Sequence, residues 1–170
     1  MKKLIALLLI AVLALSAAAC SSQPAGTEAP AEGTEAAAPA DGAKVVKIGV
    51  FEPASGDNGA GGKQEILGMQ YANSLIPTVE IGGETYKVEL VYADNASSND
   101  KAPTAAQTLI SSGVSIVLGS YGSGVSIAAG DTFSAARVPA VGVTCTNPQV
   151  TSDCDVYFRI CFLDPFQGTV

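Results

Sequence analysis

From Lys44 onward, short β-branched and apolar segments alternate with segments of helical periodicity. The expected strands cover 44–51, 87–92, 114–118, 138–143 and 156–160, and a hairpin turning at Gly82 and Gly83 leads into the second of them. The expected helices cover 64–75 and 126–136, with a third, capped by Asn99 or Asp100, running to Ser112. This alternation predicts an α/β domain over residues 44–170, with a mostly parallel sheet flanked by helices.

The first twenty residues have the composition of a targeting segment. Lys2 and Lys3 precede an apolar run from Leu4 to Leu15, and small residues follow as far as Cys20. The run is short for a bilayer-spanning helix and typical of a secretory signal. A cysteine directly after small residues resembles the lipobox of bacterial lipoproteins. The resemblance implies a lipoprotein signal peptide over 1–19, cleavage before Cys20 and a lipid on Cys20. An ordinary cleaved signal followed by an incidental cysteine is the alternative.

Residues 21–43 consist mainly of Ala, Pro, Gly, Thr and Glu, with no aromatic or large aliphatic side chain. Such a segment buries too little surface to offset the entropy lost on ordering. We therefore expect residues 20–43 to be a lipidated cysteine followed by a disordered tether, which holds the folded domain off a bacterial membrane on its extracytoplasmic side.

The composition excludes several classes of function. The 170 residues include no histidine, which excludes Ser-His-Asp and Cys-His catalytic units and imidazole metal sites. Nine Lys and Arg residues against sixteen Asp and Glu residues argue against binding of a nucleic-acid backbone. We therefore expect no metal, no cofactor and no nucleic-acid partner.

Glycine-rich loops suggest nucleotide chemistry, but their spacing does not meet its requirements. The first loop departs from a P-loop at Asp57 and Gln64, where glycine and Ser or Thr are needed. The loop GSYGSGVS has Ile127 at the third glycine position of a dinucleotide fingerprint. It also has Tyr121 where a nucleophile elbow around Ser123 needs glycine.

The same loop offers a different chemistry. Ser123 and the free backbone N–H groups at the start of a helix can bind a carboxylate. Thr144 and Thr146 follow the next strand, and loops at the carboxyl ends of parallel strands converge. Together the two loops can hold a carboxylate and a neighbouring ammonium, as in an α-amino acid. The alternative is that Ser123 only caps its helix and the threonines only satisfy a turn.

Six segments carry a family resemblance: VKIGVFEPASG, GGKQEILGMQYAN, VELVYADNASS, SIVLGSYGSGVSIAAGD, VPAVGVTCTNPQVT and YFRICFLDPFQGTV. They resemble the N-terminal lobe of bacterial solute-binding proteins of the branched-chain amino acid type, which serve ABC transporters. The resemblance covers residues 44–170, with 116–148 as the most specific stretch. It implies a type I periplasmic binding protein fold, of which the second lobe is missing here.

The resemblance also implies roles for particular residues. Ser123 and the Gly124 N–H would meet the ligand carboxylate, and Thr146 and the Thr144 carbonyl would take its ammonium. Relatives often carry a ligand-packing aromatic in the first loop, at the position of Gly61 here. The implied function is a lipoprotein that captures an amino acid or small amide and delivers it to an ABC permease. A ligand-sensing receptor ectodomain is the alternative, and an enzyme on the same scaffold is a weaker one.

Two further expectations concern the C-terminal part. Asp164 and Pro165 form a helix start only a few residues before Val170, so we expect a fragment of a longer protein, with a short C-terminal tail as the alternative. The spacing of Cys145 and Cys154 allows a disulfide across the loop between them. Small buried thiols are the alternative.

Overall fold

The computed structural model describes residues 43–169. The predicted signal peptide (1–19), Cys20 and the predicted tether as far as residue 42 lie outside the described residues. Within residues 43–169, every helix is too short or too polar to span a lipid bilayer.

A six-stranded sheet forms the centre of the domain. Its strands are β1 (Val45–Glu52), β2 (Thr78–Ile81), β3 (Glu84–Asp94), β4 (Ile116–Leu118), β5 (Ala140–Gly142) and β6 (Tyr157–Arg159). They lie in the order β2-β3-β1-β4-β5-β6, and only the β2–β3 pair is antiparallel. Gly82 and Gly83 both have positive φ in the turn between these two strands, as the predicted hairpin requires. The prediction of a mostly parallel sheet is confirmed.

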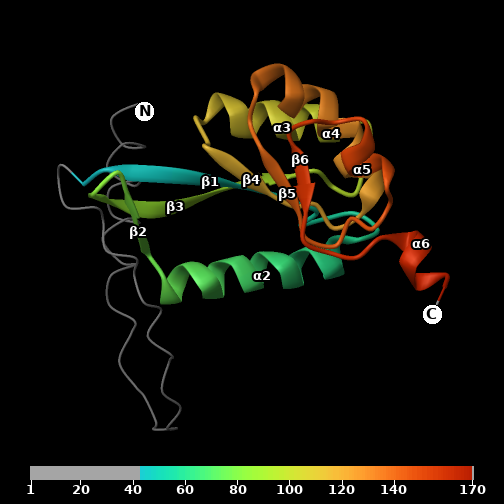
Figure 1. Ribbon diagram of the computed structural model, residues 1–170, viewed down its shortest axis with the longest axis horizontal. Helices are drawn as coiled ribbons and strands as arrows, with labels where there is room; N and C mark the ends of the chain where they lie inside the picture. Colours follow the sequence, from blue (N-terminus) through green and yellow to red (C-terminus); the bar gives the residue numbers. More distant parts are fainter. Residues whose placement is uncertain (1–42, 170) are drawn as a thin grey trace, which may run out of the picture. The chain divides into compact units, whose positions relative to one another are not determined.

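Helices cover both faces of the sheet. They are α2 (Gly59–Leu75), α3 (Ala102–Ser111), α4 (Ser123–Ala136), α5 (Gln149–Ser152) and α6 (Asp164–Gln167). Figure 1 shows α3 and α4 together on one face of the sheet and α2 on the other. The core lies under α3 and α4, where the ring of Phe133 makes edge contacts with Phe51 (centroids 5.4 Å apart) and Tyr157 (6.2 Å).

Two helices begin earlier than their periodicity predicts. Helix α2 starts at Gly59, before the expected 64, although its first turn contains three glycines, which are poor helix formers. A side chain at Gly62 would collide with the carbonyl of Pro53, so glycine permits the helix to pack against the loop that precedes it. Tertiary packing therefore outweighs local propensity at this end of α2.

The start of α4 changes the role of Ser123, because this helix begins at Ser123 and not at 126. Helix α3 begins at Ala102, with Lys101 in the capping position and no side-chain cap, so the predicted caps Asn99 and Asp100 were wrong. Gly113 follows α3 with φ of 74°, which ends that helix as expected.

Candidate ligand-binding site

The candidate site lies at the edge of the sheet where the parallel strands end. The register pairs Glu52 with Asp94 and Leu118 with Val141, so the carboxyl ends of β1, β3, β4 and β5 lie at the same edge. Four loops meet there: 53–58, 95–101, 119–122 and 143–148. This is the edge at which open α/β sheets bind ligands.

Ser123 joins two of these loops. Its Oγ accepts a hydrogen bond from the backbone N–H of Asn147 (3.1 Å), in the loop after β5. Because a hydroxyl can accept and donate at once, the Ser123 O–H proton stays available to a further acceptor. The first N–H groups of α4, including that of the exposed Gly124, have no intrahelical carbonyl to bond. Ser123 is therefore not the cap of its own helix, and the start of α4 has donors for a carboxylate.

The two threonines lie in the loop that Ser123 contacts. Thr144 Oγ1 donates to Glu65 Oε1 (2.6 Å). The exposed Thr144 backbone carbonyl accepts no hydrogen bond from residues 43–169. The Thr146 carbonyl accepts the N–H of Asp164 (3.0 Å), while its hydroxyl bonds no other described residue. The predicted convergence of the two loops is confirmed, and the ligand roles of the four residues Ser123, Gly124, Thr144 and Thr146 stay predictions.

Tyr121 also borders the site, although the sequence analysis treated it only as a mismatch to a motif. The ring lies over Gly61 of α2, so that a methyl group on Gly61 would lie 2.5 Å from Tyr121 Cζ. Its backbone N–H donates to Glu52 Oε2 (2.6 Å), and 37% of the residue's surface is exposed. An aromatic ring from the loop after β4 therefore fills the space over Gly61, the position at which the resemblance implied an aromatic.

A second residue that the sequence analysis did not assign to the site is Asn99. A methyl group on Gly124 would lie 2.9 Å from Asn99 Oδ1, so the Asn99 amide borders the start of α4. Asn99 follows β3, and its position after a parallel strand was a signal that could have identified it.

Asp94 fastens the first loop to the end of β3. Its carboxylate accepts hydrogen bonds from the N–H groups of Ala54 (2.9 Å) and Ala96 (2.8 Å) and from Ser55 Oγ (2.7 Å). Burial raises the pKa of Asp94, but the bonds from Ser55, Ala96 and Ala54 outweigh burial and lower it below its usual range. Asp94 is therefore an anchor that is charged at neutral pH.

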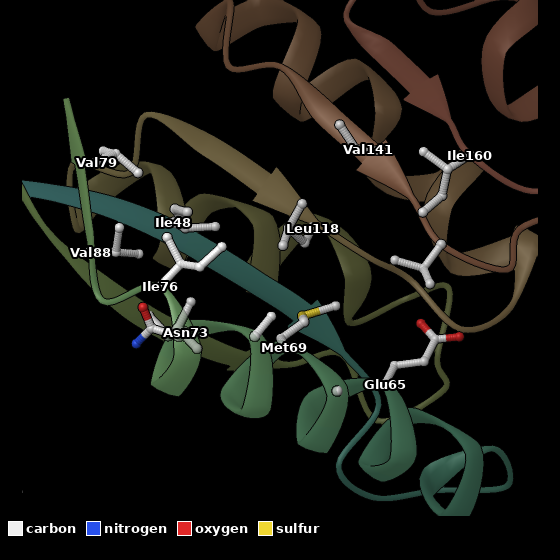
Figure 2. A pocket seen from close by; sticks show the side chains of 14 residues that line it. Ile48, Glu65, Met69, Asn73, Ile76, Val79, Val88, Leu118, Val141 and Ile160 are labelled. Atoms are coloured by element: carbon white, nitrogen blue, oxygen red, sulfur yellow. The ribbon is translucent and has the colours of Figure 1, made fainter. Parts of the chain in front are cut away.

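A separate groove runs between α2 and the sheet and encloses about 490 Å³. Figure 2 shows Met69 and Asn73 of α2, and Ile76 directly after it, facing Ile48, Val88 and Leu118 of the strands across this groove. Its lining residues include no Lys or Arg, and Glu65 is the one acidic residue among them. The groove therefore lacks a cationic partner for a carboxylate, and the strand ends fit an amino acid head group better.

Cys145 and Cys154 do not form the disulfide that their spacing allowed. Both are free thiols, as is Cys161. Cys145 is fully buried, whereas Cys154 Sγ lies 3.5 Å from the carbonyl of Gly130 on α4. Burial is the main reason why the pKa of the Cys145 thiol is raised to about 11. The alternative of a small buried thiol therefore holds for Cys145, whereas Cys154 and Cys161 are only partly buried.

A family model described as periplasmic binding protein matches residues 45–165. The chain belongs to the periplasmic binding protein family. An amino acid binding protein of Pseudomonas aeruginosa is 35% identical over 128 residues, which cover 74% of this chain and 34% of that protein. The crystal structure of the leucine binding protein LivK from Thermotoga maritima is 36% identical and superposes with a TM-score of 0.67, over 73% of this chain and 35% of that one. LivJ from Streptococcus pneumoniae, solved with isoleucine, is 30% identical with a TM-score of 0.63, over 71% and 35% of the two chains.

These matches confirm the predicted resemblance to type I periplasmic binding proteins of the branched-chain amino acid type. They also confirm the predicted fold class. This periplasmic binding protein sequence spans about a third of the length of the curated relatives that it matches.

Proposed function

We propose that residues 44–170 are the N-terminal lobe of an extracytoplasmic solute-binding protein of an ABC importer. Its ligand would be an amino acid of the branched-chain type or a related small amide. The observation that carries the proposal is the bond from Asn147 N–H to Ser123 Oγ, since it brings carboxylate donors and ammonium acceptors to one edge of the sheet. The ligand class is supported by the leucine binding protein and the isoleucine complex among the structural relatives.

In the proposed complex, the Ser123 hydroxyl and the Gly124 N–H donate to the ligand carboxylate. The N-terminal end of α4 adds favourable electrostatics for an anion. The Thr146 hydroxyl and the Thr144 carbonyl accept from the ligand ammonium, and the exposed Tyr121 ring borders the aliphatic side chain.

The proposed role is binding without chemical turnover. The partner of Ser123 Oγ is a backbone N–H, which cannot take its proton as a general base would. The chain also lacks histidine, the commonest activating base. Ligand would instead favour closure of two lobes by contacting both, and the closed protein would deliver it to a permease.

A thermal-shift screen on the full-length gene product tests the proposed ligand class. Leucine, isoleucine and valine are compared with isoamylamine, which lacks the carboxylate of leucine, and with 4-methylpentanoate, which lacks its ammonium. We expect one of the amino acids to raise the melting temperature, with about 2.7 kcal/mol of stabilisation at a hundred times its Kd. Both analogues should have little effect. Equal shifts for an amino acid and its analogues, or no shift with any amino acid, would contradict the proposed binding mode.

The proposed lipid anchor is tested separately at Cys20. Expressed in a bacterium, the wild-type protein should partition with membranes and carry a lipid mass on an N-terminal Cys20, whereas Cys20→Ala should be released in unlipidated form. A mature wild-type protein that starts elsewhere and carries no lipid would contradict the anchor but not the ligand site.

A further inference from the structure

Two carboxyl groups lie in contact beneath the candidate site. Glu52 is the last residue of β1 and is 1% exposed, and Glu65 lies on the second turn of α2. Each carboxyl group uses one oxygen for a site loop: Glu52 Oε2 accepts Tyr121 N–H, and Glu65 Oε1 accepts Thr144 Oγ1, both at 2.6 Å. Apart from burial, the hydrogen bond and the charge of Glu65 act most strongly on the Glu52 carboxyl group, so the two side chains are neighbours. The pair therefore connects β1 and α2 to two of the four loops of the candidate site, 119–122 and 143–148.

The remaining oxygens have no partner. Glu52 Oε1 and Glu65 Oε2 are both buried and accept no hydrogen bond. A buried acceptor without a donor is costly, and two carboxylates in contact cannot both be charged without a compensating cation. The ion pairs within residues 43–169 are Lys44 with Glu84 and Arg137 with Asp155, so no basic side chain there neutralises this pair.

We propose that Glu52 and Glu65 share one proton, and that this acid pair positions the Tyr121 and Thr144 loops for ligand. A proton held between the two groups gives the pair a hydrogen bond, because the protonated group donates and the ionised group accepts. The site does not resemble a carboxylate-rich metal site, since no group of three or more His, Cys, Asp or Glu residues occurs among the described residues. Both orphaned oxygens are also closed to solvent.

The surroundings of the pair favour retention of this proton. Burial, followed by the hydrogen bond and the charge of Glu65, raises the pKa of Glu52 from the ordinary 4.5 to about 9. The phenol of Tyr157 on β6, which donates to the Gly119 carbonyl (2.6 Å), also interacts with the charge of Glu52, and the Cys145 thiol lies near this phenol in turn. None of these groups carries a positive charge, so none stabilises the doubly ionised pair.

The sign of the pH effect follows from the direction of this shift. Between pH 4.5 and about 9 the folded protein holds a proton that the unfolded chain has released. Stability from the pair is therefore greatest below pH 4.5 and declines as the pH rises towards 9. For one proton, the unfolding equilibrium constant should rise roughly tenfold per pH unit within this window, relative to a variant without the shared proton.

The test measures the free energy of unfolding of the full chain without ligand between pH 5 and pH 9. It compares the wild type with Glu52→Gln and Glu65→Gln. An amide N–H replaces the shared proton permanently, so both variants should remain folded and show a flatter pH profile than the wild type. Glu89→Gln, at an exposed position on β3, is the matched control and should keep the wild-type profile. Infrared spectra at pH 7 should show a protonated carboxyl C=O band in the wild type that is lost in both pair variants.

The shared proton would be overturned if the free energy of unfolding of the wild type and of Glu65→Gln changed in parallel with pH. It would also be overturned if the wild type showed no protonated carboxyl band at pH 7. The positioning role rests on the proposed function and is measured separately, as the amino acid affinity of the full-length gene product. This affinity should weaken towards pH 9 in the wild type and weaken less in Glu65→Gln. Affinity that follows the same pH profile in both proteins would overturn this role. Failure to bind any amino acid, with the infrared band present, would instead reject the proposed function and leave the shared proton standing.

Discussion

The ring of Tyr121 lies over Gly61, and a methyl group on this glycine would lie 2.5 Å from Tyr121 Cζ. The relationship joins residues 60 positions apart, one on α2 and one in the loop after β4. Because Gly61 has no side chain, the Tyr121 ring can approach α2 this closely, and this approach sets where the ring borders the candidate site.

Gly61→Ala should move the Tyr121 ring and destabilise the protein by about 1 kcal/mol, near the lower end of overpacking effects because the ring is partly exposed. Gly68→Ala on the same helix is the matched control, since a methyl group there meets no atom within 4 Å. That variant should gain about 0.5–1 kcal/mol from helix propensity. Urea denaturation measures both. A double variant with Tyr121→Ala should cost less than the sum of the single changes. Additive costs would argue against the collision.

Ser123→Ala and Thr146→Ala should each weaken amino acid binding by about 1–3 kcal/mol, the cost of leaving a ligand charge without its hydrogen bond. Isothermal titration calorimetry on the full-length gene product measures the change. Thr104→Ala, at an exposed position on α3, is the control and should bind as the wild type does. Unchanged affinity in both site variants would remove these residues from the proposed ligand site.

Asp94→Ala should loosen the first loop and cost about 1 kcal/mol, since it removes three hydrogen bonds that are partly exposed to solvent. Because the pKa of Asp94 is lowered in the folded state, its contribution is present above its ordinary pKa of 3.8 and is lost as the pH falls further. Faster amide hydrogen exchange at Ala54 and Ala96 is the expected local signature. Asp100→Ala is the control, and equal exchange in the two variants would speak against the anchor.

Cys145 should resist alkylation at pH 8 until the protein unfolds, because the thiol is fully buried and burial raises its pKa to about 11. Cys154 and Cys161 are partly exposed and should react first. Mass spectrometry after native and denaturing alkylation distinguishes the three sites. A disulfide between Cys145 and Cys154, or native labelling of Cys145 at the rate of Cys161, would contradict the buried free thiol.

Local signals located the strands and the loops of the candidate site. The β-branched run before Glu52 predicted β1, and the glycines at 82 and 83 predicted the hairpin, because both depend on neighbouring residues only. Ser123 and Thr146 could be proposed for the same reason, since each follows an expected parallel strand and such strands end at a common edge.

Other features depend on packing between distant parts of the chain. The start of α2 at Gly59 was missed, because close contact between Gly62 and Pro53 outweighs the low helix propensity of glycine. The contact of Tyr121 with Gly61 was missed for a related reason, since no local pattern indicates which loop covers a helix.

The sequence by itself determined the α/β class and the edge of the sheet where a ligand can bind, because these follow from the order of strands, helices and loops. Its six motif segments carried the resemblance to the family. Only the tertiary structure decided which side chains meet beneath that edge. Glu52 and Glu65 read as two unrelated acids in the sequence, and they become a pair because the packing of α2 on the sheet brings their carboxyl groups together and excludes water from them.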